Sequence, residues 1–556
     1  MGRGYSRRDW QALAATLLLA LVLRGVLCSR LACLSRDGVQ FITFARQLAS
    51  DPIATMTATT KQPGFSWLLL GLHGAVNLVV DASSPFAWQR CGQTIALVGG
   101  ICVCGLIFVL TRRLFDTATT AIAGIFGAVW PQGAHLSADV LSDMPHLALY
   151  LAAFLFAYRA LKSDRLGWLV PSGIVAGLAY MLRQEAMGLV VAAAVCWAWP
   201  DRRRSWLRQL AGVATVALCF AAVIAPYSIA TGKVLPNKNP WNLLFGTPQK
   251  LTTETSNEKD EGGRMKDEKV AEAGATAVVG SLFILHPSSF IFPSASLPAR
   301  RDGDVFAGVT SWWMAPPKMI EGWAKSGRYI ISTLFLLALV LKSAPRADPT
   351  GRRLAIAAVF LQLLAVQFRI KSYGEISSRY MIIPLVLCIP WAASGLLALL
   401  NVVAARLRAA WNVQSIDVRT LGTILVALPM LYYLARPINY EKAQFRHAGE
   451  WLYQHARPGD LVLAHDRLEQ LMFYAGRTYP DQTWLRCSPT ESVEAIRAEI
   501  SQRHPQWYVD VEGGAQQRAD RGSDRQATSS RAIPDLQPAW SGGASGQEVR
   551  IFHVVP

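Results

Sequence analysis

Repeated apolar runs of membrane-spanning length dominate the sequence and exclude an ordinary soluble fold. A helix crosses a bilayer with roughly 17–25 mainly apolar residues, because it pairs every backbone N–H and C=O internally. The 556-residue chain is 52% hydrophobic. Eleven stretches fit a crossing, several of them short: 11–33, 93–111, 118–131, 146–161, 168–181, 187–199, 209–230, 327–341, 354–369, 381–400 and 420–435. We therefore predict a polytopic α-helical membrane protein with about 11 transmembrane helices.

Lysine and arginine are distributed unevenly between the predicted loops. Cytoplasmic loops of membrane proteins carry an excess of these residues. With the N-terminus inside, the arginine clusters at 202–204 and 352–353 are cytoplasmic, whereas the outer loop 132–145 has no Lys or Arg. The same asymmetry explains much of the net charge of +17, so that charge does not indicate a nucleic-acid-binding protein. We predict a cytoplasmic N-terminus and an extracytoplasmic C-terminus, in the inner (plasma) membrane of a bacterium.

Two further apolar segments, 65–80 and 277–292, are predicted to lie at the membrane interface or to re-enter it. A single crossing by either one would invert the loops that follow it and place the arginines at 202–204 or those at 352–353 outside.

Three of the predicted outer segments are long, namely 34–92, 231–326 and 436–556. The second contains a highly charged stretch, 252–272, which is typical of a mobile loop. The third alternates predicted helices with predicted strands. Its helices are expected at 440–455, 469–475 and 491–503, its strands at 460–465, 506–511 and 548–555, and a loose segment at 513–546. We predict a transmembrane domain over 1–435, with outer loops 34–92 and 231–326, and a small extracytoplasmic α/β domain over 436–556.

Charged residues inside or beside the first span are candidates for function. A charge within a span costs on the order of 2.5–3.5 kcal/mol and usually faces a cavity or a partner. Arg24 either extends to the outer interface or binds a phosphate or carboxylate. Asp37 follows in Ser-Arg-Asp-Gly-Val-Gln-Phe. It is either the N-cap of an amphipathic helix over 39–48 or a general base for an acceptor hydroxyl.

Two more cations lie on the predicted outer side. Lys61 precedes Gln-Pro-Gly and suits either a phosphate ligand or an ordinary interfacial lysine. Arg379 stands before Tyr380 at the start of the tenth predicted span. Its guanidinium either grips a phosphate bidentately or anchors the helix.

Acidic residues accompany these cations. Asp139 and Asp143 share an outer loop, and their spacing of four predicts that both lie on one helical face. The alternative is a solvated loop that caps the next span. Arg183 and Glu185 sit between two spans and also suit a structural ion pair. Because all these residues fall on the outer side, the sequence predicts a site at the outer membrane surface.

In their order and spacing, these elements resemble the C-type (GT-C fold) membrane glycosyltransferases that use polyprenyl-phosphate sugars. The chain is similar to the protein O-mannosyltransferase and lipid A aminoarabinose transferase families, over most of residues 10–435. The motifs that carry the resemblance are Arg24 in the first span, Arg36-Asp37-Gly38 with Phe41 and Ala45, Lys61-Gln62-Pro63-Gly64-Phe65, Ser142-Asp143, the run from Gly177 to Glu185, and Ser378-Arg379-Tyr380 with Pro384.

The resemblance implies an inverting transfer of a sugar from a polyprenyl-phosphate carrier, on the extracytoplasmic face, to a lipid, glycan or protein acceptor that the sequence does not identify. Asp37 would be the base, and Asp143 a second acid near the sugar or acceptor. The donor phosphate would be held by Lys61, Arg379, Arg24 and Arg183. Substrate contacts would come from Asp139, Tyr380 and Glu185.

Two positions depart from the mannosyltransferase pattern. Gly38 stands where those enzymes often have Glu, and Phe41 replaces the usual Tyr, which weakens the case for protein O-mannosylation. We predict no cofactor, no metal site and no nucleic-acid partner; a divalent cation is not predicted, although the sequence does not exclude one. The alternatives are a transporter or flippase for a lipid-linked sugar, although inverted repeats are not evident, a lipid-pyrophosphate-dependent ligase or polymerase of similar fold, and an inactive relative that only binds lipid-linked sugar.

Overall fold

The computed structural model describes most of the chain. The described residues are 5–59, 61–82, 84–199, 205–232, 315–343, 348–373, 377–411, 417–465, 468–477, 483–487, 493–512, 536–544 and 547–555. The arginines at 202–204, the charged stretch 252–272, the apolar segment 277–292 and most of the outer loop 231–326 lie outside them, so the predictions for these segments stay predictions.

Every predicted span coincides with a helix. These helices are α1 (Arg7–Ser29), α5 (Pro85–Leu114), α6 (Thr117–Val129), α8 (Asp143–Ser163), α9 (Leu169–Leu182), α10 (Met187–Ala198), α11 (Trp206–Thr231), α14 (Ile330–Val340), α15 (Pro349–Tyr373), α16 (Ile382–Trp411) and α17 (Val418–Ala435). Among the described residues, six are long and apolar enough to cross a membrane, namely α1, α5, α8, α11, α15 and α16, and the others are shorter. A mostly helical membrane architecture is confirmed, whereas the number of eleven crossings stays a prediction.

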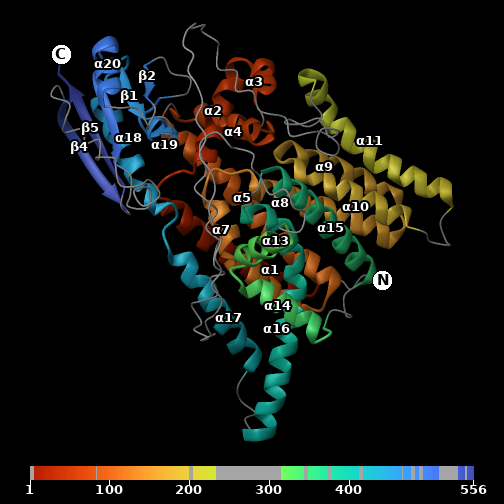
Figure 1. Cartoon of the computed structure of the whole chain (residues 1–556). Helices are drawn as coiled ribbons and strands as arrows, with labels where there is room; N and C mark the ends of the chain where they lie inside the picture. Colours follow the sequence, from red (N-terminus) through yellow and green to blue (C-terminus); the bar gives the residue numbers. More distant parts are fainter. Residues whose placement is uncertain are drawn as a thin grey trace, which may run out of the picture.

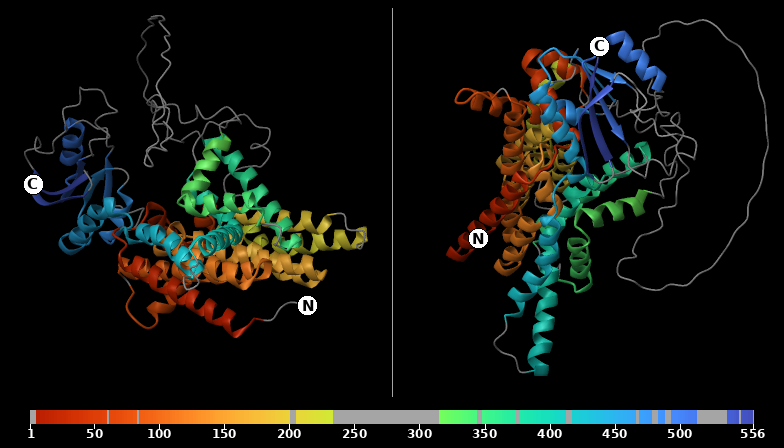
Figure 2. Two further views of the ribbon diagram at one scale, coloured as in Figure 1. Left: turned by 90° about the horizontal axis from the view of Figure 1, so that it is seen from below. Right: turned by 90° about the vertical axis from the view of Figure 1, so that its left-hand side faces the viewer.

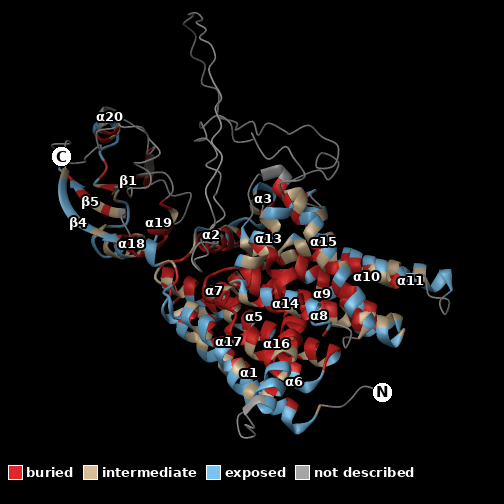
Figure 3. Cartoon of the chain, turned by 60° about the horizontal axis from the view of Figure 1, so that its bottom comes forward, coloured by how far each residue is buried: buried red, intermediate tan, exposed pale blue. Residues whose placement is uncertain are grey.

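The buried core lies in the middle of the helical bundle, around α5, α7 (Pro131–Ala138), α8, α14 and α16 (Figure 3). Large apolar side chains on the outside of the bundle remain exposed, as at Leu218 of α11 and Leu425 of α17. In a bilayer these side chains face lipid, so their exposure carries no hydrophobic penalty. Within the core, small residues bring helices together: a Cβ on Gly395 of α16 would collide with the backbone carbonyl of Leu334 in α14.

Shorter helices cover one end of the bundle. They are α2 (Arg36–Ser50), α3 (Pro52–Ala58), α4 (Gly64–Asn77) and α13 (Ala315–Ser326). The amphipathic helix expected over 39–48 is present, but it starts earlier, at Arg36. Its N-cap is Ser35, whose Oγ accepts from the backbone N–H of Gly38 at 3.2 Å. The interpretation of Asp37 as an N-cap is therefore wrong, and its carboxylate is available for other contacts.

The C-terminal part forms a mixed five-stranded sheet in the order β2-β1-β3-β5-β4 (Figure 2). Its strands are β1 (Val462–His465), β2 (Trp484–Cys487), β3 (Trp507–Glu512), β4 (Leu536–Ala544) and β5 (Gln547–Val554), and its helices are α18 (Ala443–His455), α19 (Glu469–Tyr474) and α20 (Val493–Arg503). The strands β2 and β3 run parallel to β1, and β5 is antiparallel to both β3 and β4.

The sequence did not predict β2 or β4. The first has only four residues, and the second contains proline and glycine, which are depleted in strands. The prediction of a loose segment is therefore wrong for 536–544. Here β4 is an edge strand and accommodates Pro538 at an irregularity in its register with β5.

Buried hydrogen bonds join α19 to the segment before α2, and Figure 1 shows the two helices side by side. The hydroxyl of Tyr474 accepts from the backbone N–H of Leu34 at 3.1 Å and donates to Gln89 Oε1 at 3.2 Å. Gln470 Nε2 donates to the carbonyl of Leu34 at 3.2 Å. Through these contacts α19 is attached to the segment that leads into α2, the helix that carries Asp37. The domain boundary at residue 435 stays a prediction.

Arg24 is fully buried and caps the C-terminal end of α6. Its Nη1 donates to the carbonyl of Ala128 at 2.9 Å and its Nη2 to that of Gly127 at 3.0 Å, while its Nε donates to Ser137 Oγ at 3.2 Å. The last carbonyls of a helix lack partners within the helix and carry partial negative charge. The interpretation that Arg24 extends to the interface is wrong, and its observed partners are carbonyl and hydroxyl oxygens.

Replacing Arg24 by methionine should destabilise the protein. Each buried polar group left without a partner costs roughly 1–3 kcal/mol, and the variant leaves two carbonyls and a hydroxyl without this donor. We expect a clear fall in the unfolding temperature of the detergent-solubilised protein. Arg30→Met, at the exposed end of α1, is the control. Equal unfolding temperatures for the two variants would contradict the capping role.

Candidate functional site

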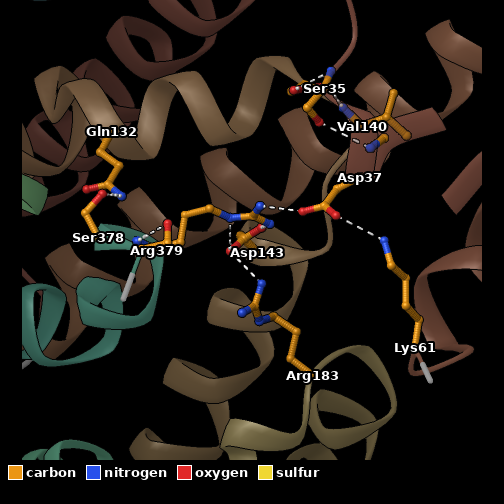
Figure 4. Close-up of polar contacts among 12 residues, drawn as sticks. Ser35, Asp37, Lys61, Gln132, Val140, Asp143, Arg183, Ser378 and Arg379 are labelled. Atoms are coloured by element: carbon orange, nitrogen blue, oxygen red, sulfur yellow. Dashed lines mark hydrogen bonds and ion pairs between the residues drawn. The ribbon is translucent and has the colours of Figure 1, made fainter. Parts of the chain in front are cut away.

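Charged side chains from five separate segments meet at the end of the bundle that carries α2 and α4 (Figure 4). Asp37 comes from the first turn of α2, Lys61 from the segment before α4, and Asp143 from the start of α8. Arg183 lies between α9 and η2 (Gln184–Ala186), and Arg379 lies in η5 (Ser378–Met381). The structure therefore brings together five of the residues that the sequence proposed.

Asp37 is held between two cations. Its Oδ1 lies 3.1 Å from Lys61 Nζ, and its Oδ2 lies 2.7 Å from Arg379 Nη1. The side chain of Asp37 is 42% exposed, against 28% for Lys61 and 25% for Arg379. Of these three groups, the carboxylate is thus the one most open to an incoming molecule.

Burial and charge act in opposite directions on the pKa of Asp37. Desolvation raises the pKa, but the ammonium of Lys61 and the guanidinium of Arg379 outweigh it and lower the pKa to about 2. Burial also lowers the pKa of Lys61, against the charge of Asp37. Asp37 is therefore a stable carboxylate while both cations contact it, and it becomes more basic when either one leaves.

Asp143 fixes Arg379 from the buried side. Arg379 donates from Nε and Nη2 to the two carboxylate oxygens, at 3.3 and 2.5 Å, and Arg183 Nη1 donates to Oδ1 at 2.8 Å. The Asp143 side chain has no exposed surface. A buried charge needs such partners, and the bidentate contact fixes the plane of the guanidinium. Asp143 thereby holds the Arg379 guanidinium in place for its contact with Asp37.

The charges continue to Glu185, whose Oε1 lies 2.8 Å from Arg183 Nη2. The structural ion pair considered for these two residues is confirmed as a contact. The ring of Tyr380 contacts two guanidinium groups: the Cζ atom of Arg183 lies 5.7 Å from the ring centroid and that of Arg369 lies 4.1 Å from it. From Lys61 to Glu185 the charges alternate in sign, so the cluster holds three cations and three anions in contact.

Asp139 supports the cluster indirectly, by holding the backbone at the start of α2. It lies in extended backbone after α7 and is buried. Its carboxylate accepts from the backbone N–H of Ser35 at 3.2 Å and from that of Val140 at 2.7 Å. Asp143 belongs to the next helix, so the predictions of a shared helical face and of a solvated loop are both wrong. Burial raises the pKa of Asp139. Asp139 fixes the start of α2 and hence the place of Asp37.

The two departures from the mannosyltransferase pattern have structural reasons. A Cβ on Gly38 would lie 3.2 Å from both Asp139 Oδ1 and the carbonyl of Val140, so a glutamate here would require these neighbours to shift by a few tenths of an ångström. Lys61 Nζ lies 4.6 Å from the centre of the Phe41 ring, which provides a cation–π contact without a hydroxyl.

Ser35, Gln132 and Ser377 also support the cluster, although the sequence did not mark them as site residues. Ser35 and Ser377 cap the segments that carry Asp37 and Arg379. Gln132 Nε2 donates at 3.2 Å to the Oγ of Ser378, which lies in η5 next to Arg379. A serine just before a helical turn is a recognisable capping signal, whereas Gln132 carries no comparable signal.

Arg24 does not join this cluster, because all three of its guanidinium nitrogens contact protein oxygens elsewhere. Its expected role in phosphate binding has no contact to support it. Within the described ranges, no group of three His, Cys, Asp or Glu side chains is arranged to hold a metal ion. The nine cysteines are free thiols.

Sequence comparison matches residues 92–229 to the family of dolichyl-phosphate-mannose-protein mannosyltransferases. This segment runs from α5 to α11 and contains Asp143 and Arg183. No curated protein sequence matches the chain.

Solved structures show the same fold over nearly the whole chain. ArnT from Cupriavidus metallidurans bound to undecaprenyl phosphate gives a TM-score of 0.54 at 13% identity, over 98% of both chains. Its apo state gives 0.52 at 12% identity, over 97% of both chains. The apo oligosaccharyltransferase of Archaeoglobus fulgidus gives 0.50 at 13% identity, over 90% of this chain and 69% of that one. The predicted resemblance to the C-type membrane glycosyltransferases is confirmed.

Replacing Asp143 by asparagine should destabilise the protein more than Asp37→Asn does. Removing one partner of a buried ion pair costs about 3–5 kcal/mol, because the remaining charge stays buried. Asp37 is partly exposed, so solvent screens the loss of its charge. Thermal unfolding in detergent measures both variants. If Asp37→Asn lowered the unfolding temperature as much, Asp143 would not be the main anchor of the arginines.

Proposed function

We propose that this protein is a glycosyltransferase that moves a sugar from a polyprenyl-phosphate donor to a hydroxyl-bearing acceptor. The observation that carries the proposal is one exposed carboxylate, Asp37, in contact with two cations, Lys61 and Arg379. Such a transfer needs a base for the acceptor and positive charge for the departing phosphate. The binding of undecaprenyl phosphate by ArnT, which shares the fold, supports this donor class.

In the proposed reaction, Arg379 and Lys61 bind the donor phosphate. Asp143 holds the Nε and Nη2 edge of Arg379, so Nη1, which donates to Asp37 at 2.7 Å, is the nitrogen that a phosphate can share. As the bond between the anomeric carbon and the phosphate oxygen breaks, the electron pair leaves with the phosphate. Preorganised cations stabilise this growing negative charge without further rearrangement.

Asp37 is the proposed base. It takes the proton of the acceptor hydroxyl while the acceptor oxygen bonds to the anomeric carbon, opposite the leaving phosphate, so the configuration inverts. A carboxylate with a pKa of about 2 is a weak base. When a bound phosphate shares the charge of Lys61 and Arg379, Asp37 loses part of its compensation and its pKa rises. Donor binding thus makes Asp37 a stronger base.

The remaining cluster residues hold this arrangement in place. Arg183 and Glu185 complete the charge balance around Asp143, and Asp139 fixes the start of α2. Asp143 was expected to be a second acid near the substrate; since it is buried between two arginines, we propose that it positions Arg379 instead. Tyr380, whose ring contacts the guanidinium groups of Arg183 and Arg369, borders the same site.

We further propose that the site faces the extracytoplasmic side of a bacterial plasma membrane. The distribution of Lys and Arg between the loops supports this orientation. The sheet lies at the same end of the bundle as α2 and α3, whereas the joined ends of α16 and α17 point to the opposite end (Figure 1). The N-terminus would then be cytoplasmic and the sheet extracytoplasmic.

Asp37→Asn should abolish most of the transfer activity. A positioned general base contributes about 10²–10⁴-fold to a rate, and an amide cannot accept the proton. The assay follows a radiolabelled polyprenyl-phosphate sugar incubated with membranes that contain the variant, and counts both the glycosylated product and free polyprenyl phosphate.

Asp51→Asn is the matched control, because Asp51 is an exposed carboxylate near the end of the same helix and asparagine also caps α3. Undiminished transfer by Asp37→Asn would refute the assignment of the base. Movement of intact donor across the bilayer by the wild type, without cleavage, would favour a transporter.

A further inference from the structure

A cavity of about 750 Å³ lies beside the charged cluster, between α2, α3 and α19. Its volume falls within the range of small-molecule binding sites. Lys61 lines this cavity and contacts Asp37, so one cation connects the cavity to the proposed base. A molecule bound here would therefore lie next to the site of transfer.

One wall of the cavity is a polar stripe along α2. Gln40, Thr43, Gln47 and Ser50 all line the cavity. Their spacings of three, four and three residues place them on one face of the helix. Asp37 stands three residues before Gln40, at the head of this stripe. The stripe consists of amides and hydroxyls and carries no charge, so it offers hydrogen bonds along a path that leads to the carboxylate.

The C-terminal part supplies the opposite wall. Glu469 of α19 accepts from Gln40 Nε2 at 3.1 Å and from Arg36 Nη2 at 2.8 Å. These contacts orient the amide of Gln40 and join the two walls. Phe44 and Phe473 border the cavity but are only 4% and 3% exposed, so they present little ring surface to it. The cavity thus combines the neutral hydrogen-bonding groups of the stripe with three charged side chains, those of Lys61, Glu469 and Arg477.

We propose that this cavity binds the acceptor of the transfer and that the acceptor is polyhydroxylated, as in a glycan or the sugar head group of a glycolipid. The identification as the acceptor site rests on the proposed glycosyltransferase function. Amides, hydroxyls and charged side chains all form hydrogen bonds with the hydroxyl groups of a sugar.

Other occupants fit the cavity less well. An acyl chain would displace water from the amides and hydroxyls of the lining and offer no hydrogen bonds in return, which is costly. An extended peptide binds best along an unpaired strand edge, and the described lining residues come from helices and the segment before α4. A strongly charged ligand would have to compete for the charged residues of the lining, because Lys61 is paired with Asp37, Glu469 is paired with Arg36, and Arg477 donates to Thr483 and to the carbonyl of Arg457. A neutral, hydroxyl-rich molecule satisfies the stripe most completely.

The test compares two tryptophan substitutions on α3. Ala54 lines the cavity and is exposed, so Ala54→Trp fills space without disturbing the core. Ile53 is 60% exposed and is not part of the lining, so Ile53→Trp adds the same ring elsewhere on the same helix. Equilibrium binding of fluorescently labelled di- to tetrasaccharides is measured on the purified full chain, and thermal unfolding verifies that both variants are folded.

We expect at least one saccharide to bind the wild type and Ile53→Trp equally, and Ala54→Trp about tenfold more weakly, which corresponds to ~1.4 kcal/mol. With donor present, the ratio of transfer to the saccharide over hydrolysis of the donor should fall to a similar extent in Ala54→Trp. Equal binding by all three proteins would overturn the proposal, as would binding of a serine- and threonine-containing peptide or a phospholipid probe in place of the saccharides.

Failure of the glycosyltransferase function has a separate signature. In that case no protein, including the wild type, would cleave any polyprenyl-phosphate sugar. Saccharide binding that is sensitive to Ala54→Trp would then still identify the cavity as a saccharide site, but the acceptor role would be lost.

Discussion

The ion pairs of the Arg379 guanidinium hold the site together. Its Nε and Nη2 contact Asp143, which is fully buried at the start of α8, and its Nη1 contacts Asp37 on α2. Residues separated by more than three hundred positions are thereby held in contact. Because Asp143 is also bound by Arg183, the guanidinium cannot turn away without breaking a buried pair. The exposed half of the cluster is consequently preorganised around Arg379.

The sequence predicted the helices and the site residues better than the contacts. Apolar runs identified every long helix, because length and hydropathy alone determine a membrane span. Charges on one predicted face identified Asp37, Lys61, Asp143, Arg183 and Arg379, which do meet. The partners of Arg24 were not predictable, because they are the backbone carbonyls of Gly127 and Ala128, and every residue type has such a carbonyl. The spacing of Asp139 and Asp143 misled, because α7 ends just before Asp139 and α8 begins only at Asp143, so no helix contains both.

The C-terminal part is more closely tied to the site than its composition suggests. Tyr474 and Gln470 hold the backbone of Leu34, and Asn439 Nδ2 donates to the carbonyl of Cys33 at 2.8 Å. Those residues lead directly into Ser35, whose N–H binds Asp139 and whose hydroxyl caps α2. The position of Asp37 thus depends on contacts from both parts of the chain. The same helix, α19, forms the second wall of the cavity, so one element both places the base and shapes the space beside it.

The central claim is that Asp37 and a donor phosphate compete for Lys61 and Arg379. The most direct measurement is the affinity of the purified protein for a short-chain polyprenyl phosphate, with wild type, Asp37→Asn and Asp37→Glu compared at neutral pH. Removal of the competing carboxylate should make Asp37→Asn bind severalfold more tightly than wild type, whereas Asp37→Glu, which keeps the charge, should bind like wild type. Equal or weaker binding by Asp37→Asn would contradict this account, because the cations would then not be shared between the carboxylate and the phosphate.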